Sequence, residues 1–453
     1  MTNDLSGIVK AYDVRGTVPD QLNEPIAGAI GRAFAQTLRA GGDDRGTIVV
    51  AHDMRESGPA LVEAFTNGVR AEGINVVHAG LGSTDLLYYA SGILDVPGAM
   101  FTASHNPAQY NGIKLCYAGA KPVGQDSGLA EIRERAERLI DEPMPEPTGT
   151  IERRDMLEGY GEHLRKLVDL SGIRPLKVVV DAGNGMGGYT VPAVLGVLPA
   201  LQIVPLYFEL DGSFPNHEAN PLEPANIVDL QKAVVAEKAD IGLAFDGDAD
   251  RCFVVDANGD PVSPSAITAL VAARELAKHP GSVIIHNLIT SSAVPEIVRE
   301  HGGEPVRTRV GHSFIKAEMA RTGAVFGGEH SAHYYFKDFW GADTGMLAAM
   351  HVLAALGESD KPLSEIAHEY ERYVSSGEIN SRVADAAGRL AEVKLHFKGE
   401  EQDELDGLTV RFADGAWINL RPSNTEPLLR LNVEAPTHDR MSELRDETLA
   451  IVR

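Results

Sequence analysis

The chain has 453 residues, 43% of them hydrophobic, and its 65 acidic and 41 basic side chains give a formal net charge of −24 at pH 7. At roughly 100 to 200 residues per domain, this length predicts about three or four domains. The excess of negative charge argues against a broad nucleic-acid-binding surface, because nucleic acid is itself a polyanion. A pocket for one small anion is compatible with this composition, since it needs only a few cations.

The two cysteines, Cys116 and Cys252, lie far apart in the sequence and show no C-x-x-C or Cys/His metal-ligand spacing. This argues against a disulfide framework or a zinc site and fits a reducing compartment. The chain does not open with a charged segment followed by an apolar core, and no apolar stretch approaches the roughly 18 residues that span a bilayer. We therefore expect a soluble, cytoplasmic protein without membrane contact.

Short apolar runs alternate with longer amphipathic stretches through most of the chain. The clearest runs are Thr47–Ala51, Val76–Ala79, Lys177–Asp181 and Ile203–Leu206. Short buried strands separated by amphipathic helices are typical of α/β units with largely parallel sheets. Because three such blocks have similar length and order, we expect three related α/β domains.

Domain boundaries are suggested where this pattern breaks. Asp141–Pro147 contains three prolines in seven residues and follows a charged helical pattern at Leu129–Ile140, so we place the first boundary there. From about Tyr373, short alternating stretches predict strands of a small α+β domain with an antiparallel sheet, at Val393–Phe397, Thr409–Phe412, Trp417–Leu420 and Leu428–Val433. The domains we expect are residues 1–146, 147–256, 257–370 and 371–453.

A short polar segment follows the apolar run Pro97–Phe101. It reads Thr102-Ala103-Ser104-His105-Asn106-Pro107 and leads into Asn111-Gly112-Ile113-Lys114. The Asn-Pro and Asn-Gly pairs predict a tight exposed loop, in which a serine hydroxyl can reach a substrate. The alternative is a loop whose serine and asparagine only cap turns. A serine hydrolase is disfavoured because the G-x-S-x-G elbow is missing.

An acidic turn, Asp246-Gly247-Asp248-Ala249-Asp250-Arg251, follows the apolar run Ile241–Phe245. Aspartates at alternate positions after a strand can direct their carboxylates at one hard cation, and oxygen ligands alone favour Mg²⁺ or Ca²⁺ over zinc. An EF-hand is disfavoured because Ala257 stands where its twelfth-position glutamate is needed. A solvated acidic turn is the alternative, although three crowded carboxylates repel one another without a cation.

Two further segments have the composition of ligand-binding loops. In Gly327–His333, the side chains of Glu329, Ser331 and His333 alternate as on one side of an extended segment, where they can face a polyhydroxylated ligand. Arg421–Pro427 (RPSNTEP) offers a guanidinium fork, hydroxyls and turn N–H groups around a phosphate. Taken alone, the first is equally typical of a polar strand end and the second of a turn with capping hydroxyls.

Together the four segments supply a hydroxyl nucleophile, a magnesium site, a polyol reader and a phosphate clamp, which are the parts needed for phosphoryl transfer on a sugar phosphate. At these residues the sequence resembles the α-D-phosphohexomutase family, and within it the bacterial phosphomannomutase/phosphoglucomutase branch. The resemblance extends from Lys10-Ala11-Tyr12-Asp13-Val14-Arg15-Gly16 to the Arg421–Pro427 loop. It implies three related α/β domains with mixed, mostly parallel sheets and a smaller C-terminal α+β domain, arranged around a central cleft.

The resemblance also implies a role for each site residue. Ser104 carries the phosphoryl group, and Asp246, Asp248 and Asp250 bind Mg²⁺ together with Ser104. Arg251 supports the phosphoserine, and Lys114 or His105 is the general acid/base. The residues implied to bind substrate are Tyr12, Arg15, His312, Glu329, Ser331, His333, Arg421, Ser423, Asn424 and Thr425.

The implied reaction interconverts mannose 6-phosphate and mannose 1-phosphate, and also the glucose phosphates, through a phosphoserine and a hexose 1,6-bisphosphate that serves as intermediate and activator. The expected partners are small hexose phosphates, and the protein is expected to be a monomer or homodimer. The nearest alternatives are a phosphoglucosamine mutase and a strict phosphoglucomutase. A Mg²⁺-dependent sugar-phosphate phosphatase and a non-enzymatic sugar-phosphate-binding protein are weaker ones, because neither needs both Ser104 and the triple-aspartate turn.

Overall fold

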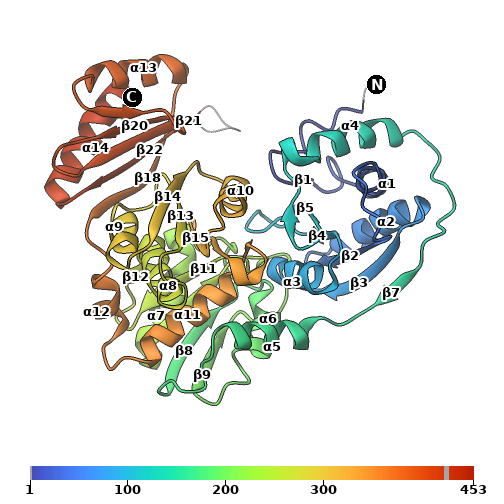
Figure 1. Ribbon diagram of the computed structural model, residues 1–453, viewed down its shortest axis with the longest axis horizontal. Coiled ribbons are helices and arrows are strands. Elements are labelled where there is room, and N and C mark those ends of the chain that lie inside the picture. Colours follow the sequence, from blue (N-terminus) through green and yellow to red (C-terminus); the bar gives the residue numbers. More distant parts are fainter. Residues whose placement is uncertain (1–2, 423–427) are drawn as a thin grey trace. The chain divides into compact units, whose positions relative to one another are not determined.

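A computed structural model of the chain describes residues 3–422 and 428–453, with the side chain of His312 excepted. The chain divides into two compact units, which are described separately below. The first unit comprises Met1–Val262 and Ser331–Ser364, and the second comprises Ser263–His330 and Glu365–Arg453. Figure 1 labels the elements in chain order. Among the described residues, no helix is long and apolar enough to cross a membrane.

The N-terminal part of the first unit is built on a seven-stranded mixed sheet with the order β1-β5-β4-β2-β3-β7 and with β6 paired to β5. Its strands are β1 (Val14–Thr17), β2 (Thr47–His52), β3 (Asn75–Leu81), β4 (Gly98–Phe101), β5 (Tyr110–Tyr117), β6 (Lys121–Pro122) and β7 (Ile151–Arg153). Its helices are α1 (Glu24–Ala40), α2 (Gly58–Ala71), α3 (Thr84–Leu94), the 3₁₀ turn η1 (Gln125–Ser127) and α4 (Leu129–Leu139). Ile48 and Val50 share a core with α1, α2 and α4, as expected when alternate strand residues point to one face.

The middle part of the first unit is a five-stranded sheet with the order β12-β11-β10-β8-β9. Its strands are β8 (Leu176–Asp181), β9 (Leu201–Leu206), β10 (Ile241–Phe245), β11 (Cys252–Asp256) and β12 (Pro261–Val262). Its helices are α5 (Leu157–Leu167), α6 (Gly187–Val194), η2 (Pro224–Ile227) and α7 (Val228–Glu237). Strands β9, β8 and β10 are parallel, whereas β10 and β11 form an antiparallel hairpin whose turn carries the three aspartates.

The last part of the first unit contains the antiparallel strands β16 (Tyr334–Phe336) and β17 (Ala342–Asp343), the turn η3 (Lys337–Phe339) and α11 (Gly345–Gly357). One buried carboxyl, that of Asp85 in the first turn of α3, connects this part with the two before it. Asp85 accepts hydrogen bonds from the hydroxyl groups of Ser83, of Tyr160 at 2.7 Å and of Thr344 at 2.7 Å. The three parts of the first unit therefore meet at the N-terminus of α3.

The second unit begins with the parallel strands β14-β13-β15 and their helices. These are α8 (Pro264–Lys278), β13 (Val283–Asn287), α9 (Ala293–Glu300), β14 (Glu304–Thr308), α10 (His312–Thr322) and β15 (Phe326–Gly328), while α12 (Leu363–His368) lies where the chain re-enters this unit. The rest is an antiparallel sheet with the order β18-β22-β21-β20-β19. Its elements are β18 (Val374–Arg382), α13 (Ala386–His396), β19 (Glu401–Asp403), β20 (Leu408–Arg411), β21 (Trp417–Pro422), β22 (Leu428–Ala435) and α14 (His438–Val452).

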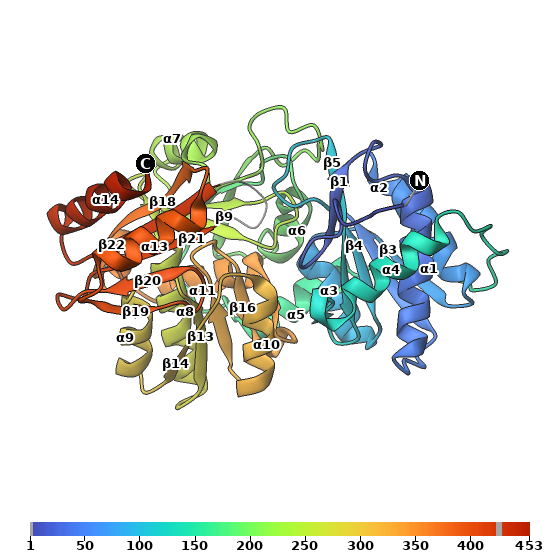
Figure 2. The same ribbon diagram turned by 90° about the horizontal axis from the view of Figure 1, so that it is seen from above.

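Helices α13 and α14 pack on one face of this antiparallel sheet, as Figure 2 shows. The expected strand at Val393–Phe397 is therefore wrong, because these residues belong to the end of α13. The sequence alternates polar and apolar residues there, but Val393 is fully buried whereas Leu395 is 68% exposed. Burial thus follows the helical period of about 3.6 and not the strand period of 2. The expected fold class is confirmed, with mixed α/β sheets followed by an antiparallel α+β part.

Candidate active site

Ser104 lies in the connection between β4 and β5, whose antiparallel pairing brings both ends of the loop together. Its backbone is left-handed, with φ of 48°, and its N–H donates to the Thr102 hydroxyl at 2.9 Å. The residue is only 5% exposed. Its hydroxyl therefore has a fixed direction, in contrast to the mobile hydroxyl of an ordinary surface loop.

The β10–β11 turn brings its aspartates to this loop. Asp246, Asp248 and Asp250 are all buried, and a Cβ added at Gly247 would lie 2.4 Å from the carbonyl oxygen of Ser104. A side chain at position 247 would therefore collide with the serine loop. Two turns that are far apart in the sequence are thus in direct contact.

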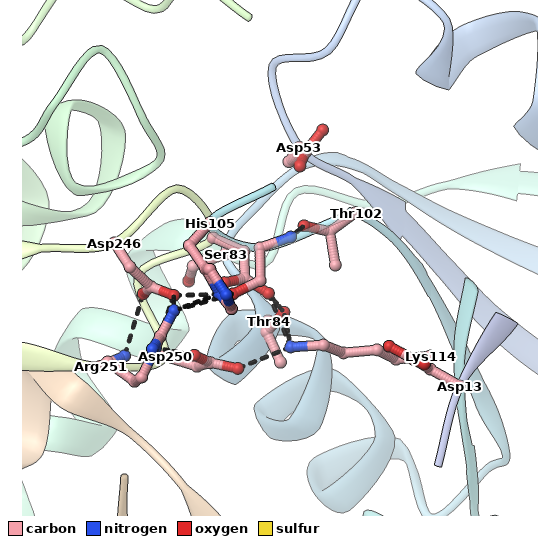
Figure 3. Close-up of polar contacts among 12 residues, drawn as sticks. Asp13, Asp53, Ser83, Thr84, Thr102, His105, Lys114, Asp246, Asp250 and Arg251 are labelled. Carbon is pink, nitrogen blue, oxygen red and sulfur yellow. Dashed lines mark hydrogen bonds and ion pairs between the residues drawn. The ribbon is translucent and has the colours of Figure 1, made fainter. Parts of the chain in front are cut away.

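The hydroxyl of Ser104 is held by two residues of the aspartate turn. It donates to Asp246 Oδ2 at 2.8 Å, and Arg251 Nη2 lies 3.4 Å from the same Oγ. Arg251 also forms an ion pair with Asp246, with 2.8 Å between Nη2 and Oδ2, and its Nη2 donates to Nδ1 of His105 at 2.5 Å. Figure 3 shows Asp246, Arg251 and His105 converging at this point. A fixed positive charge therefore lies beside the hydroxyl.

The other two aspartates, Asp248 and Asp250, accept hydrogen bonds from side chains of α3 and β5. Lys114 Nζ donates to Asp248 at 2.7 Å and to Asp250 at 2.6 Å, and the Thr84 hydroxyl donates to Asp248 at 2.6 Å. In each of these carboxylates only the Oδ2 atom is used. Lys114 lies on β5, a few residues after the serine loop, so one hairpin supplies both groups.

The three carboxylates fit a divalent cation. One oxygen from each of Asp246, Asp248 and Asp250 lies within 4.8 Å of the others. Asp248 Oδ1 and Asp250 Oδ1 are buried and have no hydrogen-bond partner among the described residues. Buried oxygens are normally satisfied, so two buried carboxylate oxygens without a partner in one acidic turn are compatible with a hard cation such as Mg²⁺.

The charges of the site shift one another's pKa. Burial raises the pKa of Asp246 to about 7, against the opposing effect of Arg251 and with the help of the neighbouring carboxylates. Although burial opposes it, Lys114 lowers the pKa of Asp248 below its ordinary value. The pKa of Lys114 is raised well above its ordinary value, because Asp248 and Asp250 outweigh its burial. Lys114 is therefore a cation here, the form that can donate a proton and cannot accept one.

The pKa of His105 is shifted downward, whereas that of Lys114 is shifted upward. Burial, with Arg251 and Arg15, lowers the pKa of His105 well below the ordinary value, so that the ring is neutral near pH 7. Because Arg251 donates to Nδ1, the ring proton belongs on Nε2. The Nδ1 atom, 3.3 Å from Ser104 Oγ, is thus an acceptor.

Four further predicted residues belong to the first unit, and three of them, Arg15, Ser331 and His333, lie at the same site. Arg15, on β1, donates to the Asn106 side chain at 2.7 Å and pairs with Asp13. His333 forms a backbone bridge with Arg251 and places Nε2 3.9 Å from Asp250 Oδ1, while Ser331 lies 3.0 Å from Nδ1 of His333. Tyr12 is half-buried just before β1.

The segment Gly327–His333, which contains Ser331 and His333, does not have the predicted extended form. A turn follows β15, and Ala332 has a left-handed φ of 64°. A left-handed residue reverses the chain locally, so Glu329, Ser331 and His333 do not lie on one side of a continuous strand. The alternation of these polar residues in the sequence therefore does not reflect a shared strand face.

The second unit positions two of the remaining residues. Glu329 is 2% exposed and its Oε1 accepts hydrogen bonds from Asn287 at 3.1 Å and from the N–H of Gly311 at 3.2 Å. Arg421, on β21, is 6% exposed and donates from Nη2 to Glu378 at 2.5 Å, while its Nη1 has no hydrogen-bond partner among the described residues. His312 begins α10. Ser423, Asn424 and Thr425 lie outside the described residues.

Sequence analysis missed several residues that shape the site. Thr84 is one, and Asp53 and Arg55 behind the serine loop are two more. A signal for the latter pair was present, because polar residues directly after a buried parallel strand lie at the carboxyl edge of the sheet, where α/β folds bind ligands. Asp53 and Arg55 follow β2 in this way.

Comparison with known proteins agrees with this arrangement over the whole chain. Family models for the phosphoglucomutase/phosphomannomutase alpha/beta/alpha domains I, II and III match residues 6–142, 158–259 and 263–373, and the model for the C-terminal domain matches residues 378–451. The chain therefore belongs to the phosphoglucomutase/phosphomannomutase family, which confirms the predicted family. The class of enzyme that follows is a phosphohexose mutase, an isomerase.

Individual relatives are similar over nearly their full length. A protein of Xanthomonas campestris pv. campestris named "Phosphohexose mutases" is 41% identical over 446 residues, which cover 97% of this chain and 98% of that protein. A "Phosphomannomutase" of Salmonella typhimurium is 39% identical over 450 residues, 97% of each chain. The crystal structure of a phosphoglucomutase/phosphomannomutase family protein from Burkholderia thailandensis has a TM-score of 0.89 at 34% identity, covering 98% of this chain and 96% of that one.

Proposed function

We propose that the protein transfers a phosphoryl group between the 6- and 1-positions of mannose phosphates through a phosphoserine at Ser104. The observation that carries this proposal is the position of the Ser104 hydroxyl. It donates to Asp246 at 2.8 Å and lies 3.4 Å from the buried guanidinium of Arg251, and the same acidic turn carries two carboxylate oxygens that have no hydrogen-bond partner among the described residues. A hydroxyl between a fixed cation and a metal-binding acidic turn suits phosphoryl transfer.

In the proposed reaction, the bond between phosphorus and Oγ of phosphoserine 104 breaks and a bond to a sugar hydroxyl oxygen forms. The proton of the sugar hydroxyl passes to a general base, and a general acid gives a proton to the departing Oγ, so that Ser104 is left as the free hydroxyl. The resulting hexose 1,6-bisphosphate turns around and returns its other phosphoryl group to Ser104 by the reverse steps. Lys114 and His105 are the two candidates for the proton transfer.

Asp246, Asp248 and Asp250 are the residues that would hold Mg²⁺ together with Ser104. When bound, the ion offsets the negative charge of the phosphoryl group in transfer. Arg251 adds a positive charge that the protein itself fixes beside Oγ. Lys114 forms ion pairs with Asp248 and Asp250, and it lowers the pKa of Asp248, which favours the ionised form that binds a cation.

The predicted residues that do not take part in phosphoryl transfer or metal binding would bind the substrate. Arg15, Ser331 and His333 adjoin the aspartate turn or the serine loop in the first unit. Glu329, Arg421 and His312, with Ser423, Asn424 and Thr425, would bind the sugar hydroxyls and the non-reacting phosphate. Nη1 of Arg421 supports this role, because it is buried without a hydrogen-bond partner among the described residues, and such a guanidinium nitrogen favours an anionic ligand.

We also propose the finer points that accompany such an enzyme. The four expected domains, residues 1–146, 147–256, 257–370 and 371–453, would line a central cleft. A hexose 1,6-bisphosphate would act as activator by phosphorylating Ser104. The protein would be cytoplasmic and a monomer or homodimer.

The test follows mannose 1-phosphate, glucose 1-phosphate and glucosamine 1-phosphate separately by ³¹P NMR, with Mg²⁺ and a trace of glucose 1,6-bisphosphate. We expect the mannose and glucose phosphates to form 6-phosphates, and Ser104→Ala to lose at least about 1,000-fold in rate because the covalent carrier is gone. Intact-protein mass spectrometry would locate the phosphate on Ser104.

Three other outcomes of this test would contradict the proposal. Faster conversion of glucosamine phosphate would make the protein a phosphoglucosamine mutase. Release of inorganic phosphate without isomer formation would make it a sugar-phosphate phosphatase. Full activity of the Ser104→Ala variant would remove the phosphoserine mechanism altogether.

A further inference from the structure

Arg55 is the largest fully buried polar side chain near the serine loop. It follows β2, is 2% exposed, and directs its guanidinium at the loop that contains Ser104. The two N–H groups of Nη2 donate to the carbonyl oxygens of Ser104 at 2.9 Å and Asn106 at 2.7 Å. The two of Nη1 donate to those of Pro107 at 2.9 Å and Tyr110 at 2.9 Å. One side chain therefore binds four backbone carbonyls of a single loop.

The fifth N–H group of Arg55, on Nε, binds Asp53, which in turn contacts Thr102 at the start of the serine loop. Nε donates to Asp53 Oδ2 at 3.2 Å, and Asp53 also accepts the N–H of Arg55 at 3.0 Å. The Thr102 hydroxyl bonds to the Asp53 side chain and accepts the N–H of Ser104 at 2.9 Å. Both the N–H and the carbonyl of Ser104 are thus tied, through Thr102 and Arg55, to the same short segment after β2.

These contacts require a guanidinium. Four carbonyl oxygens that point at one place repel one another unless a cation lies between them, and only the planar fork of arginine supplies five N–H groups in fixed directions. The cation is enclosed, because the Phe214 ring centroid lies 5.2 Å from its central carbon and a Cβ at Gly212 would lie 2.8 Å from the Cα of Arg55. The left-handed backbone of Ser104 is disfavoured for a serine and persists only where the surroundings impose it.

We propose that Arg55 is a positioning residue, which with Asp53 holds the backbone of the serine loop so that Oγ of Ser104 is directed at Asp246 and Arg251. Arg55 bonds only to the loop backbone and Asp53 in the described structure, so it acts on the reaction through Ser104. The inference rests on the proposed role of Ser104 as the phosphoryl carrier.

Arg55→Lys separates geometry from charge. A lysine ammonium keeps the positive charge but has three donors and no planar fork, so it cannot satisfy four carbonyls and Asp53. The loop then loses its fixed shape while the substrate-binding residues stay unchanged. We expect the rate of phosphoryl transfer to fall about 100-fold, with KM for the hexose phosphate changed less than about 3-fold.

The experiment measures single-turnover phosphorylation of Ser104 by glucose 1,6-bisphosphate, by intact-protein mass spectrometry, for the wild type and Arg55→Lys. Arg32→Lys is the matched control, because Arg32 is also buried in the first unit and bonds to Glu72 at 3.0 Å but does not touch the serine loop. Thermal unfolding of each variant reports any general loss of stability. Asp53→Asn, which removes the counter-charge but retains the arginine, is the second variant should Arg55→Lys not fold, and we expect a loss of about 10-fold.

Chemical rescue adds a readout that a merely structural role would not move. In Arg55→Gly, about 50 mM guanidinium chloride should restore the transfer rate at least 10-fold, whereas 50 mM sodium chloride should not. An unchanged transfer rate in both Arg55→Lys and Asp53→Asn would overturn the inference, as would equal rate losses in Arg55→Lys and Arg32→Lys. Absence of phosphate from Ser104 in the wild type would instead overturn the proposed function.

Discussion

The two units of the chain differ in which atoms of their functional side chains are left open. In the acidic turn of the first unit, Lys114 binds Oδ2 of Asp248 and of Asp250, and the Oδ1 atoms of these two residues, which are acceptors, have no hydrogen-bond partner among the described residues. On β21 of the second unit, Glu378 binds Nη2 of Arg421, and Nη1, a donor, has no hydrogen-bond partner among the described residues. Open acceptors suit a cation and open donors suit an anion. The pattern of unsatisfied atoms therefore favours a cation at the acidic turn and an anion at Arg421.

The largest effect is expected from removing an open acceptor. In Asp250→Asn, an amide replaces the carboxylate, so the site loses one negative charge and one oxygen ligand while its shape is kept. We expect activity to fall about 100- to 1,000-fold and the Mg²⁺ concentration for half-maximal activity to rise at least 10-fold. A Mg²⁺ titration of the initial rate measures both, and chelation of Mg²⁺ should abolish wild-type activity.

The control is Asp256→Asn. Asp256 is a buried carboxylate on the neighbouring strand β11, where it accepts N–H groups of the turn at Asn258 and Asp260. It should leave the Mg²⁺ dependence unchanged even if it lowers stability. An identical Mg²⁺ dependence in Asp250→Asn and the wild type would contradict the metal site.

A smaller effect is expected from the open donor. Arg421→Lys keeps the charge but loses the bidentate fork, so one charge-assisted hydrogen bond to a phosphate is lost. Such a bond contributes about 1.5 to 3 kcal/mol, which corresponds to a rise in KM of about 10- to 100-fold. The rise should appear in KM with kcat changed much less, measured with mannose 1-phosphate.

Arg430→Lys is the matched control for this comparison. Arg430 pairs with the same Glu378 at 3.4 Å, but its side chain is 34% exposed and lies on β22. Its substitution should change KM less than about 3-fold. Equal changes in the two variants would mean that the ion pair to Glu378 alone matters, and not the open nitrogen of Arg421.

The smallest effect concerns stability and pH at the N-terminus of α3, where Asp85 follows Thr84, the residue that binds Asp248. Burial raises the pKa of Asp85 to about 6 despite its three hydroxyl partners, with Asp250 adding to the rise. Between about pH 4 and pH 6 the folded protein keeps a proton that the unfolded chain releases. The free energy of unfolding therefore falls as pH rises through this range, by up to about 3 kcal/mol.

Asp85→Asn removes this titration, because the amide carries no ionisable proton. The stability of the wild type relative to the variant should fall between pH 4 and pH 7, as measured by the first thermal unfolding transition at each pH. The exposed Asp20→Asn serves as the reference substitution. A constant difference between wild type and Asp85→Asn across this range would show that Asp85 is ionised in the folded protein throughout.

The parts of the fold that sequence predicted best are those decided by local pattern. The strand Ile241–Phe245 was predicted at its observed bounds, and the aspartates that follow it do meet. A fully apolar run followed by a glycine-containing acidic turn has few alternative structures. Where the pattern fitted two periods, as at Val393–Phe397, the residues alone could not decide, and packing of α13 against the antiparallel sheet did.

The residues that sequence missed are those whose partners are distant. Asp85 meets Thr344 across 259 positions, and Arg55 meets the carbonyls of the serine loop across about 50. A backbone carbonyl also has no sequence signature, so an arginine that binds four of them looks like any surface arginine. The left-handed turn at Ala332 was missed for a related reason, because alanine carries no preference for that conformation.

The close contact at Gly247 has a consequence for mutational tolerance. Any side chain there would enter the space of the Ser104 carbonyl, 2.4 Å from the added Cβ. In a saturation library scored by growth or turnover, position 247 should therefore reject substitutions as strictly as position 104, although glycine performs no chemistry. A map of intolerant positions would therefore include the contact between the acidic turn and the serine loop, as well as the residues that react.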